Sequence, residues 1–231
     1  TTSPMATVRS SSGELIRGVS EISLSKTNPY EISVTSEDGK TERKYKVYYK
    51  TCDYSFDDVP EKEWFYADIM EASRRGIVLG VSLKDFLPRG NIKRGDFALM
   101  IARALKADLS SYSKNSIFSD VSDNDYYAAA INYAADNGIV GGYADGTFKP
   151  NDLIKRQEVA AVVSRVLELE ERNNPKVMFT DHSIIPSWAL GNIYACRYEN
   201  VLLGDNNGNY NPVNLMTRAE AATIIVRMLK Q

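Results

Sequence analysis

The chain has 231 residues, of which 43% are hydrophobic and 25% charged, so it can bury the core of one large domain or two modest ones. Its 28 Lys and Arg residues against 30 Asp and Glu give a net charge of −2, which excludes an overall basic field for nucleic acid, so any anion binding must be local. Its apolar runs are far shorter than the roughly 18 residues of a membrane-spanning helix. The first residue is Thr1 and no basic-then-apolar leader follows, so we expect a mature form or a fragment.

Residues 1–50 are rich in Ser and Thr, and their pattern predicts β structure. Apolar and polar residues alternate on both sides of Asp38-Gly39, which is typical of a hairpin. The alternating residues are Tyr30, Ile32 and Val34, then Tyr45, Val47 and Tyr49. The stretch 29–50 resembles the closing hairpin of cadherin-like β-sandwich modules, but a whole sandwich takes about 100 residues. We expect either a missing upstream part or a small sheet packed against the remainder of the chain.

A spacing of 62 residues organises the rest of the sequence. Residues related by this spacing are Trp64, Tyr126 and Trp188; Phe86, Phe148 and Tyr210; Pro88, Pro150 and Pro212; and Arg94, Arg156 and Arg218. Only the opening Phe-x-Asp of the third copy slips, by one residue. Self-similarity at this period is the signature of a repeat architecture. We predict three repeats, at residues 54–107, 116–169 and 177–231, after the β segment at residues 1–50.

Each repeat reads as helix, long loop, helix. The first helix ends at Gly76, Gly138 or Asn200, residue types that adopt the left-handed conformation after a helix. The second helix carries apolar residues at i, i+4, i+7 and i+8, as in Phe97, Ile101, Ala104 and Leu105. A unit of about 50 residues cannot bury its apolar faces alone. We therefore predict a mainly α fold in which three helix-loop-helix repeats share one core as a three-lobed unit around a pseudo-threefold axis.

The start of each second helix is the candidate anion site. Thr217 and Glu220 form a capping box, whereas Lys93 and Lys155 stand where that hydroxyl should be. A cation at a helix N-terminus destabilises the helix by a few tenths of a kcal/mol. A bound anion would make the arrangement favourable, because the amides, the helix dipole and the guanidinium would all point at it. The candidate ligand-binding residues here are Lys93, Arg94, Lys155, Arg156, Thr217 and Arg218.

The motifs Phe-x-Asp-Val, Gly-Ile-Val-x-Gly, Asp-Gly-Thr-Phe-x-Pro and Thr-Arg-Ala-Glu, in this order, resemble the S-layer homology domain. The resemblance covers residues 54–231, and stretches 118–167 and 179–229 together carry nearly every element. It implies a mainly helical, three-lobed fold whose inter-repeat grooves bind a secondary cell wall polysaccharide, often one with pyruvate ketals. The motif's arginine lies in those grooves, which maps it to Arg94, Arg156 and Arg218. The first repeat departs most, with Lys84-Asp85-Phe86 in place of Asp-Gly-Thr-Phe and Gly-Asp after its arginine.

The chemistry fits such a ligand, because an arginine binds a carboxylate through two parallel hydrogen bonds. Two interpretations stay open for its neighbours. Trp64, Tyr126 and Trp188 either stack on a sugar ring or pack in the core. Asp58, Asp120 and Asp181 either pair with the arginines and join loop to helix, or hold them for the ligand. Gly76 and Gly138 complete the candidate site, and Arg103, Arg165 and Arg227 are interpreted as structural, because cations suit a helix C-terminus.

Other functions are less well supported. No carboxylate pair has a spacing that marks an acid/base couple, His182 is the single histidine, and we predict no enzyme, metal or cofactor. An EF-hand loop from Asp205 fails, because its sixth and twelfth positions hold Tyr210 and Met216. Net acidity and the long inter-helix loop argue against a DNA-binding helix-turn-helix. A disulfide between Cys52 and Cys196 is left open.

The sequence thus predicts an extracellular module that anchors an exported protein on the bacterial cell wall, with an anionic, pyruvylated wall polysaccharide as partner. We expect no binding of nucleic acid and no membrane insertion. No Leu-Pro-x-Thr-Gly sorting signal is present, so attachment should be non-covalent, and we expect fusion to an upstream cargo or surface-layer region. The alternative is a self-assembling surface-layer protein in which the repeats make only protein–protein contacts.

Overall fold

The structure is a computed structural model that describes residues 7–10, 30–47, 55–112, 116–173 and 175–231. The chain divides into two compact units, Thr1–Asp53 and Tyr54–Gln231. Tyr49 and Cys52, on which two of the sequence-based expectations depend, lie outside the described residues.

The first unit contains an antiparallel sheet of strands β1 (Thr7–Ser10), β2 (Tyr30–Thr35) and β3 (Glu42–Val47), in the order β1-β2-β3. The predicted hairpin is confirmed, because β2 pairs with β3 in a register that joins Tyr30 to Val47 and Thr35 to Glu42. Its turn contains Gly39 at φ +70°, a left-handed angle that glycine adopts readily. The strand β1 was not anticipated. Along β2 the side chains are only half-buried.

The second unit contains six α-helices and two short 3₁₀ helices among the described residues. The α-helices are α1 (Tyr66–Arg74), α2 (Arg94–Ala104), α3 (Ala128–Asp136), α4 (Arg156–Val166), α5 (Ser187–Tyr198) and α6 (Arg218–Met228). The 3₁₀ helices are η1 (Ser110–Tyr112) and η2 (His182–Ile184). Each repeat therefore contributes two α-helices joined by a long loop, as the sequence predicts.

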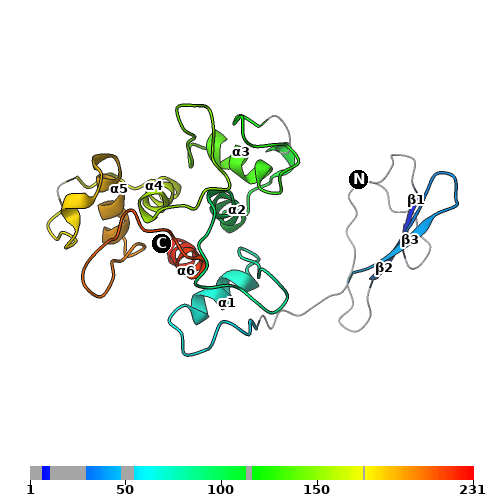
Figure 1. Ribbon diagram of the computed structural model, residues 1–231, viewed down its shortest axis with the longest axis horizontal. Helices are drawn as coiled ribbons and strands as arrows, with labels where there is room; N and C mark the ends of the chain where they lie inside the picture. The colour runs from blue at the N-terminus through cyan, green and yellow to red at the C-terminus, as the bar shows by residue number, and fades with distance from the viewer. Residues whose placement is uncertain (1–6, 11–29, 48–54, 113–115, 174) are drawn as a thin grey trace. The chain divides into compact units, whose positions relative to one another are not determined.

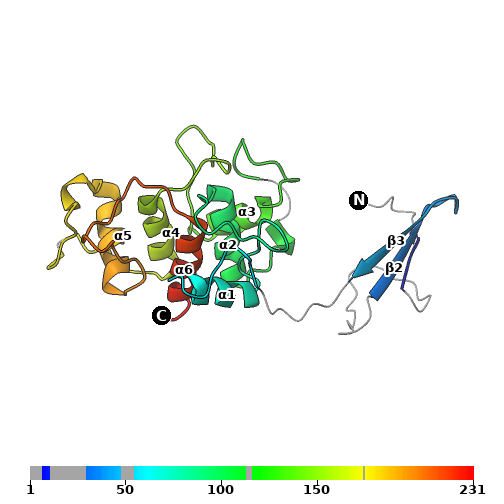
Figure 2. The same cartoon turned by 60° about the horizontal axis from the view of Figure 1, so that its bottom comes forward.

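The helices pack across repeats in a cycle. The first helix of each repeat lies against the second helix of the repeat before it, so that α3 packs on α2, α5 on α4, and α1 on α6. Figure 1 shows α2, α4 and α6 gathered near the middle of this unit, with α1, α3 and α5 around them. Figure 2 shows the same grouping from another side. The contact between the first helix and the last closes the ring, which confirms the predicted three-lobed, pseudo-threefold arrangement.

A ring of backbone hydrogen bonds marks the centre of this arrangement. Ile92 N–H donates to the carbonyl of Met216 (2.9 Å), Met216 N–H to Ile154 (2.9 Å), and Ile154 N–H to Ile92 (3.1 Å). These three residues are 62 apart, and all three side chains are buried. These three residues thus pair their backbone groups with neighbouring repeats, and a single repeat would leave those groups unpaired.

The apolar faces predicted for the helices form the core. Ile69, Met70 and Ala72 of α1 are buried, as are Phe97, Ile101 and Ala104 of α2. The equivalent residues of α4 and α6 are buried or half-buried. Burial of such apolar surface is the main term that stabilises a unit of this kind, at about 25 cal/mol per Å².

The ends of the first helices follow the prediction. The residues after α1, α3 and α5 are left-handed, with φ of +71° at Gly76, +67° at Gly138 and +55° at Asn200. No heavy atom lies within 4 Å of the position that a Cβ would occupy at Gly76 or Gly138, so the backbone angle rather than lack of space favours glycine there.

The cysteine on α5 is a structural thiol. Cys196 is buried and free, and its sulfur lies 3.6 Å from the carbonyl oxygen of Ala160. Burial raises the pKa of this thiol to about 12, which disfavours the reactive thiolate.

Candidate functional site

The arginine that opens each second helix reaches into the next repeat. Its Nε donates to the carbonyl oxygen of an aromatic residue there, and its guanidinium lies over that residue's ring. The Nε–oxygen distances are 3.0 Å from Arg94 to Phe148, 2.8 Å from Arg156 to Tyr210 and 2.8 Å from Arg218 to Phe86. The guanidinium carbons lie 4.7, 5.1 and 4.7 Å from the ring centres. Arg218 therefore joins the last repeat to the first.

Two of these arginines form ion pairs across the repeat boundary. Arg94 Nη1 lies 2.9 Å from Glu158 Oε1, and Arg156 Nη1 lies 2.8 Å from Glu220 Oε1. The arginine side chains are only 10% and 11% exposed. Desolvation makes such charges costly unless they are paired, so these two guanidinium groups depend on their carboxylates.

The third arginine has no such partner. Arg218 donates from Nε to Phe86 and from Nη2 to the carbonyl of Leu79 (2.7 Å), but no ion pair reaches it from the described residues. Burial lowers the pKa of its guanidinium, while Asp96, Asp58 and Tyr126 act in the opposite direction without contacting it. Arg218 is thus a partly desolvated cation that lacks a direct counter-ion in the described part of the chain.

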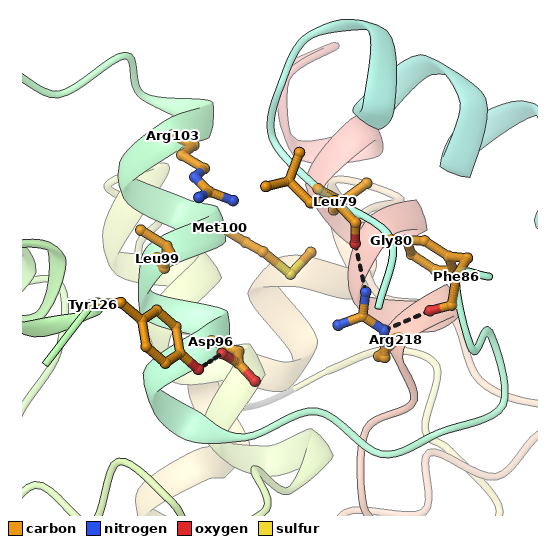
Figure 3. A pocket seen from close by; sticks show the side chains of 10 residues that line it. Leu79, Gly80, Phe86, Asp96, Leu99, Met100, Arg103, Tyr126 and Arg218 are labelled. Carbon is orange, nitrogen blue, oxygen red and sulfur yellow. Dashed lines mark hydrogen bonds between the residues drawn. The ribbon is translucent and has the colours of Figure 1, made fainter. Parts of the chain in front are cut away.

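The acid equivalent to Glu158 and Glu220 is Asp96, and it makes a different contact. Its carboxylate accepts a hydrogen bond from the hydroxyl of Tyr126 in the second repeat. Figure 3 shows this pair opposite Arg218, whose third nitrogen has no dashed line and points toward Asp96. Desolvation of the Tyr126 hydroxyl and this hydrogen bond raise its pKa, so it remains a protonated donor.

These side chains line a pocket of about 240 Å³, which we name the Arg218 pocket. It draws on all three repeats: Arg218 from the third, the loop at Val78–Gly80 and helix α2 from the first, and Tyr126 from the second. A second pocket of about 350 Å³, the Arg94 pocket, is lined by the equivalent positions of the next repeat. It is lined by Arg94, the loop around Val140–Tyr143, helix α4 and Trp188. The two pockets are therefore equivalent positions of the pseudo-threefold unit.

The repeated aromatic residues are surface residues. Trp64, Tyr126 and Trp188 are 60%, 67% and 53% exposed, so the interpretation that they pack in the core is wrong. Trp64 precedes α1 rather than lying on it, and the core position is taken by the next residue, Phe65, which is 2% exposed. Tyr126 and Trp188 instead present their rings at the rims of the two pockets.

The repeated aspartates do not pair with the arginines. Asp58 accepts hydrogen bonds from the amides of Phe86 and Leu87, at 2.8 and 2.7 Å. Asp120 does the same with the amides of residues 148 and 149, and Asp181 with those of residues 210 and 211. Both carboxylate oxygens are thus used to hold the loop of the same repeat. Of the two open interpretations, the one in which these aspartates pair with the arginines is wrong, because the acids that pair with Arg94 and Arg156 are Glu158 and Glu220 of the neighbouring repeat.

The amides at the start of the second helices are also occupied. Arg94 N–H donates to Asp152 (2.9 Å), Arg156 N–H to Asn214 (3.0 Å) and Arg218 N–H to Gly90 (2.8 Å), in each case to a carbonyl of another repeat. The next amide of each helix donates to the carbonyl of a proline, namely Pro150, Pro212 or Pro88. The expectation that these amides hold an anion is therefore wrong, and the guanidinium side chain remains as the group that can bind one.

The flanking candidates have structural contacts. Thr217 and Glu220 form the predicted capping box, with Thr217 Oγ1 accepting from the Glu220 amide (3.2 Å). At Lys155 only one of the two hydrogen bonds of a capping box is present: its amide donates to Glu158 (2.8 Å), but its ammonium cannot accept a hydrogen bond from the helix. Lys93 Nζ donates to Asn151 Oδ1 at 3.0 Å. Gly76 and Gly138 cap helices and line neither pocket.

A second arginine in each pocket went unrecognised. Arg103 lines the Arg218 pocket and Arg165 lines the Arg94 pocket, whereas the sequence predicts a structural role for both. The signal was present, because Asp96, Leu99, Met100 and Arg103 follow an i, i+3, i+4, i+7 spacing and so share one helix face. Arg165 also donates to the carbonyl of Ile139, at 3.3 Å.

Within the described residues, no three His, Cys, Asp or Glu side chains lie close enough together to hold a metal ion. A search of the same residues finds no helix with the length and apolar character needed to cross a membrane.

The sequence profile of the S-layer homology domain matches this chain three times, at residues 55–98, 117–160 and 179–222. The three matches include both arginine ion pairs and, from the Arg218 pocket, the loop at Val78–Gly80, Asp96, Tyr126 and Arg218, whereas Leu99, Met100 and Arg103 lie just beyond the first match.

Curated relatives share the same region. The chain is 34% identical to an amylopullulanase of Thermoanaerobacterium thermosulfurigenes over 185 residues, which is 78% of this chain and 10% of that protein. It is 34% identical to the cellulosome-anchoring protein of Acetivibrio thermocellus over 63% of this chain and 34% of that protein. S-layer protein EA1 of Bacillus anthracis is 31% identical over 47% of this chain and 12% of that protein. The chain thus spans a tenth to a third of the length of these relatives.

Proposed function

The chain belongs to the S-layer homology family, and on that premise we propose that its repeats anchor an exported protein by non-covalent binding of an anionic wall polysaccharide in the grooves between repeats. Its location is the bacterial cell surface, and its family is one of cell-wall-binding modules. Our proposal adds the ligand chemistry: a secondary wall polymer whose pyruvate ketals supply carboxylates.

One observation carries the proposal. Around a pocket, three different repeats place an arginine that enters from one neighbour, a second arginine on the helix face, and an exposed aromatic ring from the other neighbour. A guanidinium binds a carboxylate with charge-assisted hydrogen bonds. An exposed ring offers a flat apolar surface to a sugar. A sugar that carries a carboxylate is the ligand that uses both.

The role is that of a binding module within a larger protein. In the relatives named above, the matched region is a small part of a longer chain, so their names say nothing about the chemistry of this one. We propose that the repeats here likewise carry a cargo or a surface-layer region and have no catalytic activity of their own. We further propose that the sheet of residues 1–50 belongs to that other part.

A pull-down on purified wall sacculi tests the proposal. We expect the chain to sediment with intact sacculi and to remain in solution when the non-peptidoglycan polymer has been removed chemically. Equal binding to the two preparations would contradict a polymer ligand. Self-association of the chain in the absence of sacculi, measured by light scattering, would instead support the alternative of a self-assembling surface-layer protein.

A charge-matched control sharpens the test. Arg74 on α1 is exposed, pairs with Glu71 on the same helix and lines neither pocket. Arg74→Gln removes one positive charge and should leave the sedimented fraction unchanged. If it reduces binding as much as a substitution at Arg218, the attraction is one of overall charge and no defined site is needed.

A further inference from the structure

We infer that the three grooves are not equivalent: the Arg218 pocket is the subsite for the ligand's carboxylate, and Tyr126 is a positioning residue that keeps Asp96 from neutralising Arg218. The inference rests on the proposed function and adds to it which groove works and why.

Formal charge does not distinguish the two pockets. Each contains two arginines and one acid: Arg218, Arg103 and Asp96 in one, and Arg94, Arg165 and Glu158 in the other. What differs is whether the acid contacts the arginine that crosses from the neighbouring repeat. The two pockets thus differ in the contacts of the acid and not in charge.

In the Arg94 pocket the acid is fully engaged. Glu158 Oε1 accepts from Arg94 Nη1 (2.9 Å) and from the Tyr143 hydroxyl (3.2 Å), while Oε2 accepts from the Lys155 amide (2.8 Å). An incoming carboxylate would have to share one guanidinium with Glu158 or displace it. Two carboxylates at one site repel each other, so this pocket disfavours the ligand.

Arg156 is paired with an acid in the same way as Arg94. Glu220 Oε1 accepts from Arg156 Nη1 at 2.8 Å, and its Oε2 accepts from the amide and the hydroxyl of Thr217. The capping box fixes this glutamate in place, and with it the ion pair. Arg156 thus serves as a cross-link between the second and third repeats.

Arg218 keeps its binding capacity. A guanidinium has five N–H donors, and Arg218 uses one on Phe86 and one on Leu79. Figure 3 shows the remaining nitrogen directed into the pocket. The group has lost part of its hydration without gaining a carboxylate from the described residues, so an anionic ligand would supply the partner it lacks.

Two of the sequence differences between the pockets concern the acid and the exposed aromatic residue. Aspartate replaces glutamate at position 96, which shortens the side chain by one methylene, and tyrosine replaces tryptophan at position 126. The Tyr126 hydroxyl donates to Asp96 and draws that carboxylate to the far side of the pocket from Arg218. In the Arg94 pocket, Trp188 stands at the equivalent place, and a tryptophan has no hydroxyl with which to hold Glu158.

The first experiment compares the three arginines. The probe is a methyl hexoside that carries a 4,6-pyruvate ketal, and its methyl ester is the neutral control; binding is measured by calorimetry on the full chain. We expect Arg218→Gln to weaken binding of the ketal roughly 10- to 100-fold, which is the range for hydrogen bonds to a charged group. Arg94→Gln and Arg156→Gln should leave the affinity unchanged when it is measured at temperatures where these two variants are folded. The ester should bind weakly to every variant.

The second experiment tests the positioning role. Tyr126→Phe keeps the ring but removes the hydroxyl that holds Asp96, and we expect about tenfold weaker binding of the ketal. We expect the same loss for Asp96→Glu, because this substitution restores the longer acidic side chain found in the other repeats. Asp96→Asn should bind at least as well as the unchanged chain. In the double variant Tyr126→Phe/Asp96→Asn the loss should vanish, because no carboxylate remains to occupy Arg218.

The outcomes separate the inference from the proposed function. If Tyr126→Phe weakens binding as much in the Asp96→Asn background as in the unchanged chain, the hydroxyl contacts the ligand directly and the positioning role is overturned. If Arg94→Gln or Arg156→Gln loses as much affinity as Arg218→Gln, the grooves are equivalent and the proposed function stands without the inference. If none of the three loses affinity for the ketal or for sacculi, the proposed function itself fails.

Discussion

The Arg94 pocket and the Arg218 pocket occupy the same position in successive repeats, yet their arginines have different chemical situations. In the first, the guanidinium is 10% exposed and pairs with Glu158 at 2.9 Å. In the second, the acid is one methylene shorter and is hydrogen-bonded by Tyr126. The comparison teaches that one repeated arginine can serve as a cross-link in one place and as an available cation in another. The difference arises from the neighbouring acid rather than from the arginine.

The largest effect should separate the arginines by stability. Arg94→Ala leaves Glu158 without its partner at a site that is 19% exposed, and we expect a loss of about 3 kcal/mol of unfolding free energy, with a similar loss for Arg156→Ala. Arg218→Ala removes hydrogen bonds to two carbonyls and the contact with the Phe86 ring but breaks no ion pair, and about 1 kcal/mol should be lost. Urea unfolding followed by circular dichroism measures all three. Equal losses would contradict the distinction between the pockets.

The aspartates should behave alike where the arginines differ. Each of Asp58, Asp120 and Asp181 accepts two backbone amides of its own loop. Removing the carboxylate leaves two amides without their acceptor, so Asp→Ala should cost about 2 kcal/mol at each of the three sites. The same urea titrations test this. A much larger loss at one site would show that the three loops are not equivalent, and the comparison of pockets would then have to include them.

A smaller effect concerns the helix that carries Arg218. Thr217 caps α6 with its hydroxyl, and Thr217→Ala should destabilise the unit by about 1 kcal/mol. Thr217→Ser keeps the hydroxyl and serves as the control. Thermal unfolding of the two variants gives the difference, and an alanine variant as stable as the serine variant would show that the capping box contributes little.

The smallest effect is a gain. Lys155 stands at the N-cap of α4 without a side-chain hydrogen bond. Lys155→Thr reproduces the residue found at the start of α6, and we expect the unit to become about 0.5 kcal/mol more stable. Because the lysine lies outside the contacts of Arg218, binding to sacculi should stay the same. Reduced sedimentation would restore Lys155 as a ligand-binding residue.

Much of this structure could be predicted from sequence because its signals are local. The helix faces of Phe97, Ile101 and Ala104, the left-handed ends at Gly76 and Gly138, and the capping box at Thr217 each depend on residues a few positions apart. The 62-residue spacing added the threefold arrangement. One error concerned a single aromatic residue, since sequence could not show that Phe65 and not Trp64 enters the core. The others concerned contacts between distant segments, such as the acceptors of the amides at the start of the second helices.

The sequence by itself determined the three repeats, their helices and the family, because periodic burial and turn conformations depend on residues that are close together in the chain. Only the tertiary structure decided the partner of each guanidinium. Arg94 finds its acid 64 residues ahead, and Arg218 finds its carbonyl 132 residues back, across the contact that closes the ring. Hydrogen-bond partners at such separations depend on how the repeats pack together and on whether the acidic side chain is one methylene longer or shorter. A local sequence pattern does not predict either contact.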